Sequence, residues 1–160
     1  MELQIDDVSK TYADGTRAVR DVSLTVSEGL IGLLGPNGAG KSTLMQLIAT
    51  ITKPTAGTLR WNGTDIVERP ATMRRVLGYL PQDFGVYPEL TAAEFLDYMA
   101  ALKGLPGGAA RDRIETLLEI VGLADARDRP LGGFSGGMQQ RVGIACALLN
   151  DPDQIGRAHV

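Results

Sequence analysis

Residues 35–42 match the pattern G-x-x-x-x-G-K-[ST] at every fixed position. Glycines let successive backbone N–H groups turn toward one anion, and the N-terminus of a following helix adds partial positive charge. The Lys41 ammonium can reach the outer phosphates of a nucleotide, and the Ser42 hydroxyl can bind Mg²⁺. The pattern predicts a nucleotide phosphate site, the alternative being a glycine-rich turn without a ligand. The expected contacts are Gly35, Pro36, Asn37, Gly38, Ala39, Gly40, Lys41, Ser42 and Thr43.

Such a loop needs a strand before it and a helix after it, and the sequence offers both. Residues 30–34 form a short apolar run, typical of a strand buried on both faces. Apolar residues then recur at helical spacing through Leu44 and Ile48. Upstream, alternation over residues 3–9 and 18–26 predicts two strands joined by a hairpin loop.

Downstream of this helix the sequence changes from strands to helices. Strands are expected over residues 57–61 and 76–80. Helices are expected over residues 91–102, where Thr91 and Glu94 fit a capping box, and over residues 109–121. A last helix follows residue 137 and ends at Leu149. This order predicts an α/β core with a helical lobe inserted over about residues 90–131.

Two further motifs indicate a family. Residues 79–82, Tyr-Leu-Pro-Gln, resemble the Q-loop of the ATP-binding-cassette (ABC) family, and residues 134–141, Phe-Ser-Gly-Gly-Met-Gln-Gln-Arg, resemble its signature motif. With the phosphate loop in the same order, residues 1–153 resemble ABC transporter ATP-binding subunits, most closely those of bacterial ABC-2-type exporters. The resemblance implies an α/β fold, namely a P-loop NTPase ABC ATPase core with an antiparallel β subdomain and an inserted helical lobe.

The resemblance also implies roles for residues outside the phosphate loop. Tyr12 would stack on adenine, or would only pack on the first hairpin. Gln82 would contact Mg²⁺ and the attacking water and couple the site to a membrane partner, or would be a solvated loop amide. Ser135, Gly136 and Gly137 would contact the γ-phosphate of ATP bound to the opposite subunit, or would form an ordinary helix start.

Four residues near the signature call for separate expectations. Phe134 and Met138 depart from the leucine and glutamine usual in the family. Arg141 either pairs with an acid of the lobe or is an exposed helical arginine. Cys146 is expected to be a small core residue.

The resemblance implies ATP and Mg²⁺ as cofactors and ATP hydrolysis that energises transport. Its partners would be a second ATP-binding subunit, in a homodimer, and a transmembrane permease, with no nucleic acid. The protein would then be cytoplasmic and peripheral on the inner face of the cell membrane. Two alternatives remain open, a non-transport ABC ATPase acting on ribosomes or DNA and a non-catalytic nucleotide-binding module.

Composition limits the classes that need considering. The chain has 160 residues, 44% of them hydrophobic, a formal net charge of −3 and one cysteine. These values exclude a disordered chain and a disulfide scaffold, and they argue against a general nucleic-acid binder. No apolar run is long enough to span a bilayer, and the acidic N-terminus does not resemble a signal peptide.

The last residues do not continue the family pattern. Family members place an apolar strand ending in Asp-Glu after the last helix, and the fold is therefore expected to lack this Walker-B strand and everything beyond it. Residues 155–160, Ile-Gly-Arg-Ala-His-Val, are the translation of ATC GGA AGA GCA CAC GTC, which resembles a sequencing adapter. We therefore expect a partial nucleotide-binding domain over residues 1–153 and an artefactual tail over residues 154–160. An intact frame encoding Asp-Glu on resequencing would support this, and a genomic stop after Val160 would refute it.

Overall fold

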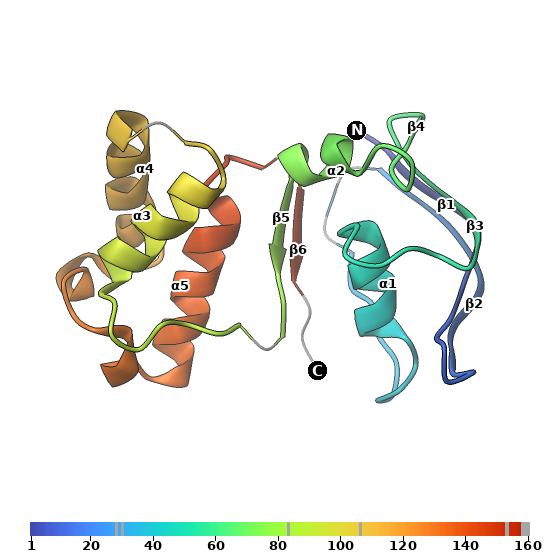
Figure 1. Ribbon diagram of the computed structural model, residues 1–160, viewed down its shortest axis with the longest axis horizontal. Helices are drawn as coiled ribbons and strands as arrows, with labels where there is room; N and C mark the ends of the chain where they lie inside the picture. Colours follow the sequence, from blue (N-terminus) through green and yellow to red (C-terminus); the bar gives the residue numbers. More distant parts are fainter. Residues whose placement is uncertain (28, 30, 83, 106, 153, 158–160) are drawn as a thin grey trace. The chain divides into compact units, whose positions relative to one another are not determined.

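The computed structural model describes residues 1–27, 29, 31–82, 84–105, 107–152 and 154–157 (Figure 1). Leu30 and residues 158–160, which belong to two of the segments predicted above, lie outside this set. The chain divides into two compact units, residues 1–75 and residues 76–159.

The first unit contains a four-stranded antiparallel sheet. Strands β1 (Leu3–Thr11) and β2 (Arg17–Val26) form the predicted hairpin, with Ile5 opposite Leu24. Strand β3 (Ala56–Trp61) pairs with the other edge of β1, and the short β4 (Thr64–Asp65) follows it, giving the order β2-β1-β3-β4. The predicted antiparallel β subdomain is therefore confirmed.

Two helices belong to the same unit. Helix α1 (Lys41–Ile48) begins at the end of the phosphate loop, as predicted, and buries Leu44 and Leu47. Helix α2 (Pro70–Val76) was not predicted, although a proline at the first helical position is a recognised start signal. Arg74 of α2 donates to the Thr50 carbonyl (2.9 Å), which follows the end of α1.

The strand predicted over residues 30–34 is wrong for the part that the structure describes. Residues 31–34 have no regular secondary structure, and Leu34 is 97% exposed. An apolar run becomes a strand only when a neighbouring segment supplies hydrogen-bond partners. No described segment pairs with residues 31–34, and the four-stranded sheet does not include them.

The second unit is mainly helical. Strand β5 (Leu77–Leu80) is followed by α3 (Ala92–Leu102) and α4 (Gly107–Ile120). Two 3₁₀ turns, η1 (Ala124–Ala126) and η2 (Leu131–Gly133), lead into α5 (Gly136–Leu148). Figure 1 shows α3, α4 and α5 gathered together, and their apolar faces form one core around Phe95, Leu117 and Val142.

Local sequence signals predicted helices α3 and α4 correctly. The Thr91 side chain accepts the Glu94 N–H, and the Glu94 carboxylate accepts the Thr91 N–H, so the predicted capping box is present. Cys146 is buried, as predicted.

Arg141 follows neither expectation, because its Nη1 donates to the Val121 and Gly122 carbonyls (3.2 and 3.0 Å) rather than to an acid. It thereby satisfies carbonyls that the end of α4 leaves without helical partners.

Strand β6 (Gln154–Arg157) follows α5 and pairs in parallel with β5, Leu77 lying opposite Gln154. This strand was not predicted. The ladder joins backbone groups of residues 154–157 to those of β5 along the whole length of both strands. In β5, Gly78 has no room for a side chain, since a Cβ there would lie 2.4 Å from the Ala147 carbonyl oxygen of α5.

Candidate nucleotide-binding site

The phosphate loop turns on two glycines with left-handed backbone. Gly38 has φ +82° and Gly40 has φ +86°, conformations that residues with a Cβ adopt only at a cost. A Cβ on Gly40 would also lie 2.0 Å from the Ala18 carbonyl oxygen of β2. The loop therefore approaches β2 more closely than any other residue type would allow.

Lys41 and the start of α1 present donors to the space above the loop. The Lys41 ammonium donates to the carbonyl oxygens of Gly35 (2.7 Å) and Pro36 (2.9 Å), which curls the loop around it. The first N–H groups of a helix have no acceptor inside the helix, and no side chain caps α1. These N–H groups and the ammonium form a cationic donor set suited to phosphate oxygens.

A cavity of about 340 Å³ lies over this donor set. Its lining combines the first hairpin with the loop and the start of α1, and every lining residue belongs to the first unit. The residues are Tyr12, Thr16, Arg17, Ala18, Asn37, Gly38, Ala39, Gly40, Lys41, Ser42 and Thr43. Tyr12, predicted from the sequence, is thus brought together with most of the predicted loop residues.

Tyr12 is held in place at both ends. Its N–H donates to the Thr16 carbonyl (2.9 Å), and its hydroxyl shares a hydrogen bond with the Thr43 hydroxyl (3.3 Å). In the same loop the Thr16 N–H donates to the Asp14 carboxylate, and this bond lowers the pKa of Asp14. The hairpin loop therefore has a defined conformation beside the phosphate loop, and the Tyr12 hydroxyl contacts the first turn of α1.

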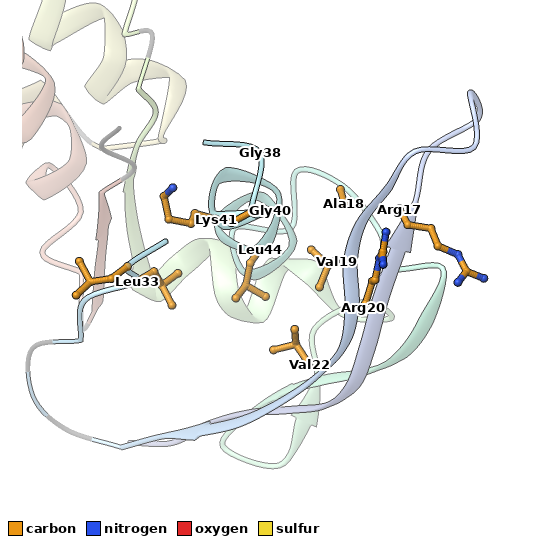
Figure 2. Close-up of a pocket in the computed structure, with 12 residues that line it drawn as sticks. Arg17, Ala18, Val19, Arg20, Val22, Leu33, Gly38, Gly40, Lys41 and Leu44 are labelled. Carbon is orange, nitrogen blue, oxygen red and sulfur yellow. The ribbon is translucent and has the colours of Figure 1, made fainter. Parts of the chain in front are cut away.

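A second cavity, of about 440 Å³, lies beside the first and was missed by the sequence reasoning. Figure 2 shows Val19 and Val22 of β2 converging with Leu44 of α1, while the Arg17 side chain extends away from them. Leu33 and Leu34 complete the apolar part of the lining. This cavity shares Gly38, Gly40 and Lys41 with the first, but Tyr12 lines only the first, which is therefore the candidate site for a whole nucleotide.

The remaining predicted residues lie in the second unit. Gln82 is exposed in a bend after β5. Ser135 caps α5, since its hydroxyl accepts the Met138 N–H (3.3 Å), and Gly136 and Gly137 form the exposed first turn with open space beside them. This arrangement presents N–H groups at a helix N-terminus, the same kind of donor set that α1 offers.

The described residues include no group of three His, Cys, Asp or Glu side chains that could hold a metal ion. Ser42 lies in the first turn of α1 beside Lys41, where its hydroxyl oxygen is a hard donor of the kind Mg²⁺ takes. Among the residues that the structure describes, no helix is both long and apolar enough to cross a bilayer.

Comparison with known proteins identifies the family. The family model described as ABC transporter matches residues 19–155. The chain belongs to the ABC transporter family. It is 41% identical over 158 residues to the ABC transporter ATP-binding protein NatA of Bacillus subtilis, covering 96% of this chain and 64% of NatA. It is 42% identical over 152 residues to the daunorubicin/doxorubicin resistance ATP-binding protein DrrA of Streptomyces peucetius, covering 94% of this chain and 46% of DrrA.

A solved structure agrees with this ABC assignment. CbiO1 of Clostridium perfringens, described as part of the ABC transporter complex CbiONQ, matches with a TM-score of 0.83 at 27% identity. The match covers 97% of this chain and 64% of CbiO1. The predicted ABC ATPase fold is therefore confirmed, and the chain spans between about half and two thirds of the length of these relatives.

Proposed function

We propose that the chain binds ATP at the cavity lined by Tyr12 and the phosphate loop, as the nucleotide-binding part of a transport ATPase. One observation supports this most strongly: Lys41 and the uncapped first turn of α1 line the same cavity as Tyr12. The cationic donors suit the triphosphate, and Tyr12 suits the base.

Mg²⁺ would be held by the Ser42 hydroxyl together with oxygens of the bound phosphates, with Gln82 as a further contact. When bound, the ion neutralises charge on the phosphates. Lys41 orients the outer phosphates, and the N–H groups of α1 fix their position.

The whole protein is proposed to hydrolyse ATP and to energise transport through a permease, with which it lies on the cytoplasmic face of the membrane. The names of NatA and DrrA, both ATP-binding proteins, support this, and DrrA's resistance role favours export. Two subunits would form a homodimer in which Ser135, Gly136 and Gly137 of one contact the γ-phosphate held by the other. The exposed, open first turn of α5 suits such a contact.

Nucleotide binding is tested by titrating the purified chain with ATP and Mg²⁺ in a calorimeter. The Lys41→Ala variant should bind at least about tenfold more weakly, because it loses a charge-assisted contact to phosphate. Lys53→Ala, which removes a lysine outside the cavity lining, is the matched control and should bind like the wild type. Equal affinity of the wild type and Lys41→Ala would refute the proposed site.

For the chain as given we propose binding without appreciable turnover, because no Asp-Glu pair follows α5 in the sequence. A coupled steady-state phosphate-release assay measures this. An ATPase rate that is present in the wild type and abolished in Lys41→Ala would contradict it.

A further inference from the structure

The ring of Tyr12 has a neighbour that none of the predicted roles includes. The Lys10 ammonium lies over the ring, 5.3 Å from its centroid. The same ammonium donates to the Lys53 carbonyl oxygen at 2.7 Å. Lys10 belongs to β1, Tyr12 follows this strand directly, and Lys53 precedes β3, which pairs with β1 through Ser9 and Ala56.

These contacts constrain the ring from different directions. The ammonium occupies one face, where the negative potential of the ring attracts a cation. The hydroxyl is tied to Thr43 in the first turn of α1. Since the ring also lines the cavity over the phosphate loop, a flat ligand in that cavity has one ring face left for stacking.

We propose that Lys10 is a positioning residue for the nucleotide base: it holds the Tyr12 ring from one face, so that the base stacks on the other. The proposal rests on the proposed nucleotide-binding function. Lys10 then acts through Tyr12 and not through the phosphates. Removal of the Lys10 ammonium should therefore lower the affinity for ligands that carry a base and leave unchanged the affinity for ligands that consist of phosphates alone.

The test compares ATP with inorganic tripolyphosphate, each with Mg²⁺, by calorimetric titration of the full chain. Lys10→Met keeps the length of the side chain and removes the charge and the donor. It should weaken ATP binding about two- to fivefold, the range of an exposed cation–π contact, and leave tripolyphosphate affinity unchanged. Lys10→Arg, which keeps a cation over the ring, should restore ATP affinity.

Two controls make the result specific. Lys53→Met removes the same charge from the same neighbourhood but keeps the carbonyl that accepts from Lys10, so it should change neither affinity. In a Tyr12→Ala background, Lys10→Met should have no further effect on ATP, because the ring through which it acts is absent.

The outcomes separate the two proposals. If the wild type binds ATP but Lys10→Met weakens the binding of tripolyphosphate as much as that of ATP, Lys10 contacts the phosphates and the positioning role is overturned. It is also overturned if Lys10→Met binds ATP like the wild type, or if its effect persists without Tyr12. A wild type that binds neither ligand overturns the proposed function and this inference with it. Far-UV circular dichroism of each variant confirms that the fold is kept.

Discussion

The two left-handed glycines of the phosphate loop differ in their surroundings. Gly38 and Gly40 have nearly the same φ, but a Cβ on Gly38 would meet nothing within 4 Å, whereas a Cβ on Gly40 would meet the Ala18 carbonyl. The pair therefore separates the cost of backbone strain from the cost of a steric clash.

Gly38→Ala should lower the free energy of unfolding by about 1–2 kcal/mol, the cost of a left-handed alanine. Gly40→Ala should lower it by about 3 kcal/mol or more, because β2 or the loop must move, and should weaken ATP binding at least about tenfold. Urea unfolding and nucleotide titration of both variants measure these effects. Equal stabilities would show that the close approach to Ala18 is not maintained in solution.

Cys146 lies in the core of the second unit and is 6% exposed. Burial raises the pKa of its thiol, an effect that the charge of Lys103 partly offsets. The raised pKa means that the folded state favours the neutral thiol. The contribution of Cys146 to the free energy of unfolding is therefore complete below the ordinary thiol pKa of about 8.5 and is lost as pH rises through the raised pKa of the folded state.

We expect native Cys146 to react slowly with a chromogenic disulfide reagent at pH 8, since the reactive thiolate is both scarce and inaccessible. The same reagent should label one thiol per chain rapidly in concentrated urea. The Cys146→Ala variant gives the background rate. Rapid labelling of the native chain would contradict the buried placement.

At the scale of elements, close packing of a strand against a helix fixes another glycine. Gly78 of β5 lies against the Ala147 carbonyl of α5, a backbone atom that has little freedom to move. Gly108 of α4 has nothing within 4 Å of its potential Cβ. The two positions should respond to alanine in opposite directions.

Gly78→Ala should lower the free energy of unfolding by about 1–3 kcal/mol through overpacking. Gly108→Ala should raise it by about 0.5–1 kcal/mol, since alanine favours the helix and restricts the unfolded chain. Urea unfolding followed by circular dichroism measures both. A Gly78→Ala variant as stable as the wild type would indicate that β5 and α5 are not packed as described.

Most helices and strands could be predicted from local signals, but the pairing of segments distant in the sequence could not. The hairpin of β1 and β2, the α1 start and the Thr91 capping box depend on residues close in sequence, and the structure confirms them. The strands predicted over residues 57–61 and 76–80 are also present, as β3 and β5. The wrong strand over residues 30–34 and the pairing of β5 with β6 depend on distant segments, which an apolar run alone does not specify. The contact of Lys10 with the Tyr12 ring is local, since residues two apart in an extended segment share a face, but the predictions above did not include it.

At the scale of the whole molecule, the residues given roles in nucleotide binding belong to different units. The residues from Tyr12 to Thr43 that line the nucleotide cavity belong to residues 1–75, and Ser135–Gly137 belong to residues 76–159. If the second set serves the nucleotide of another subunit, as proposed, binding within one subunit does not require it.

Hydrogen exchange of the dilute, monomeric chain should therefore show ATP–Mg²⁺ protection at residues 37–44 and around Tyr12, with none at residues 136–138. The degree of protection depends on how much of the site is occupied. At a free ligand concentration of 100 times Kd, binding adds about 2.7 kcal/mol to the stability of the binding-competent state. As the chain concentration rises and dimers form, protection should extend to residues 136–138, because the first turn of α5 then meets the partner's γ-phosphate. Lys41→Ala should abolish both effects. Protection of residues 136–138 in the monomer would mean that the signature acts on the nucleotide of its own subunit, and the proposed dimer contact would fall.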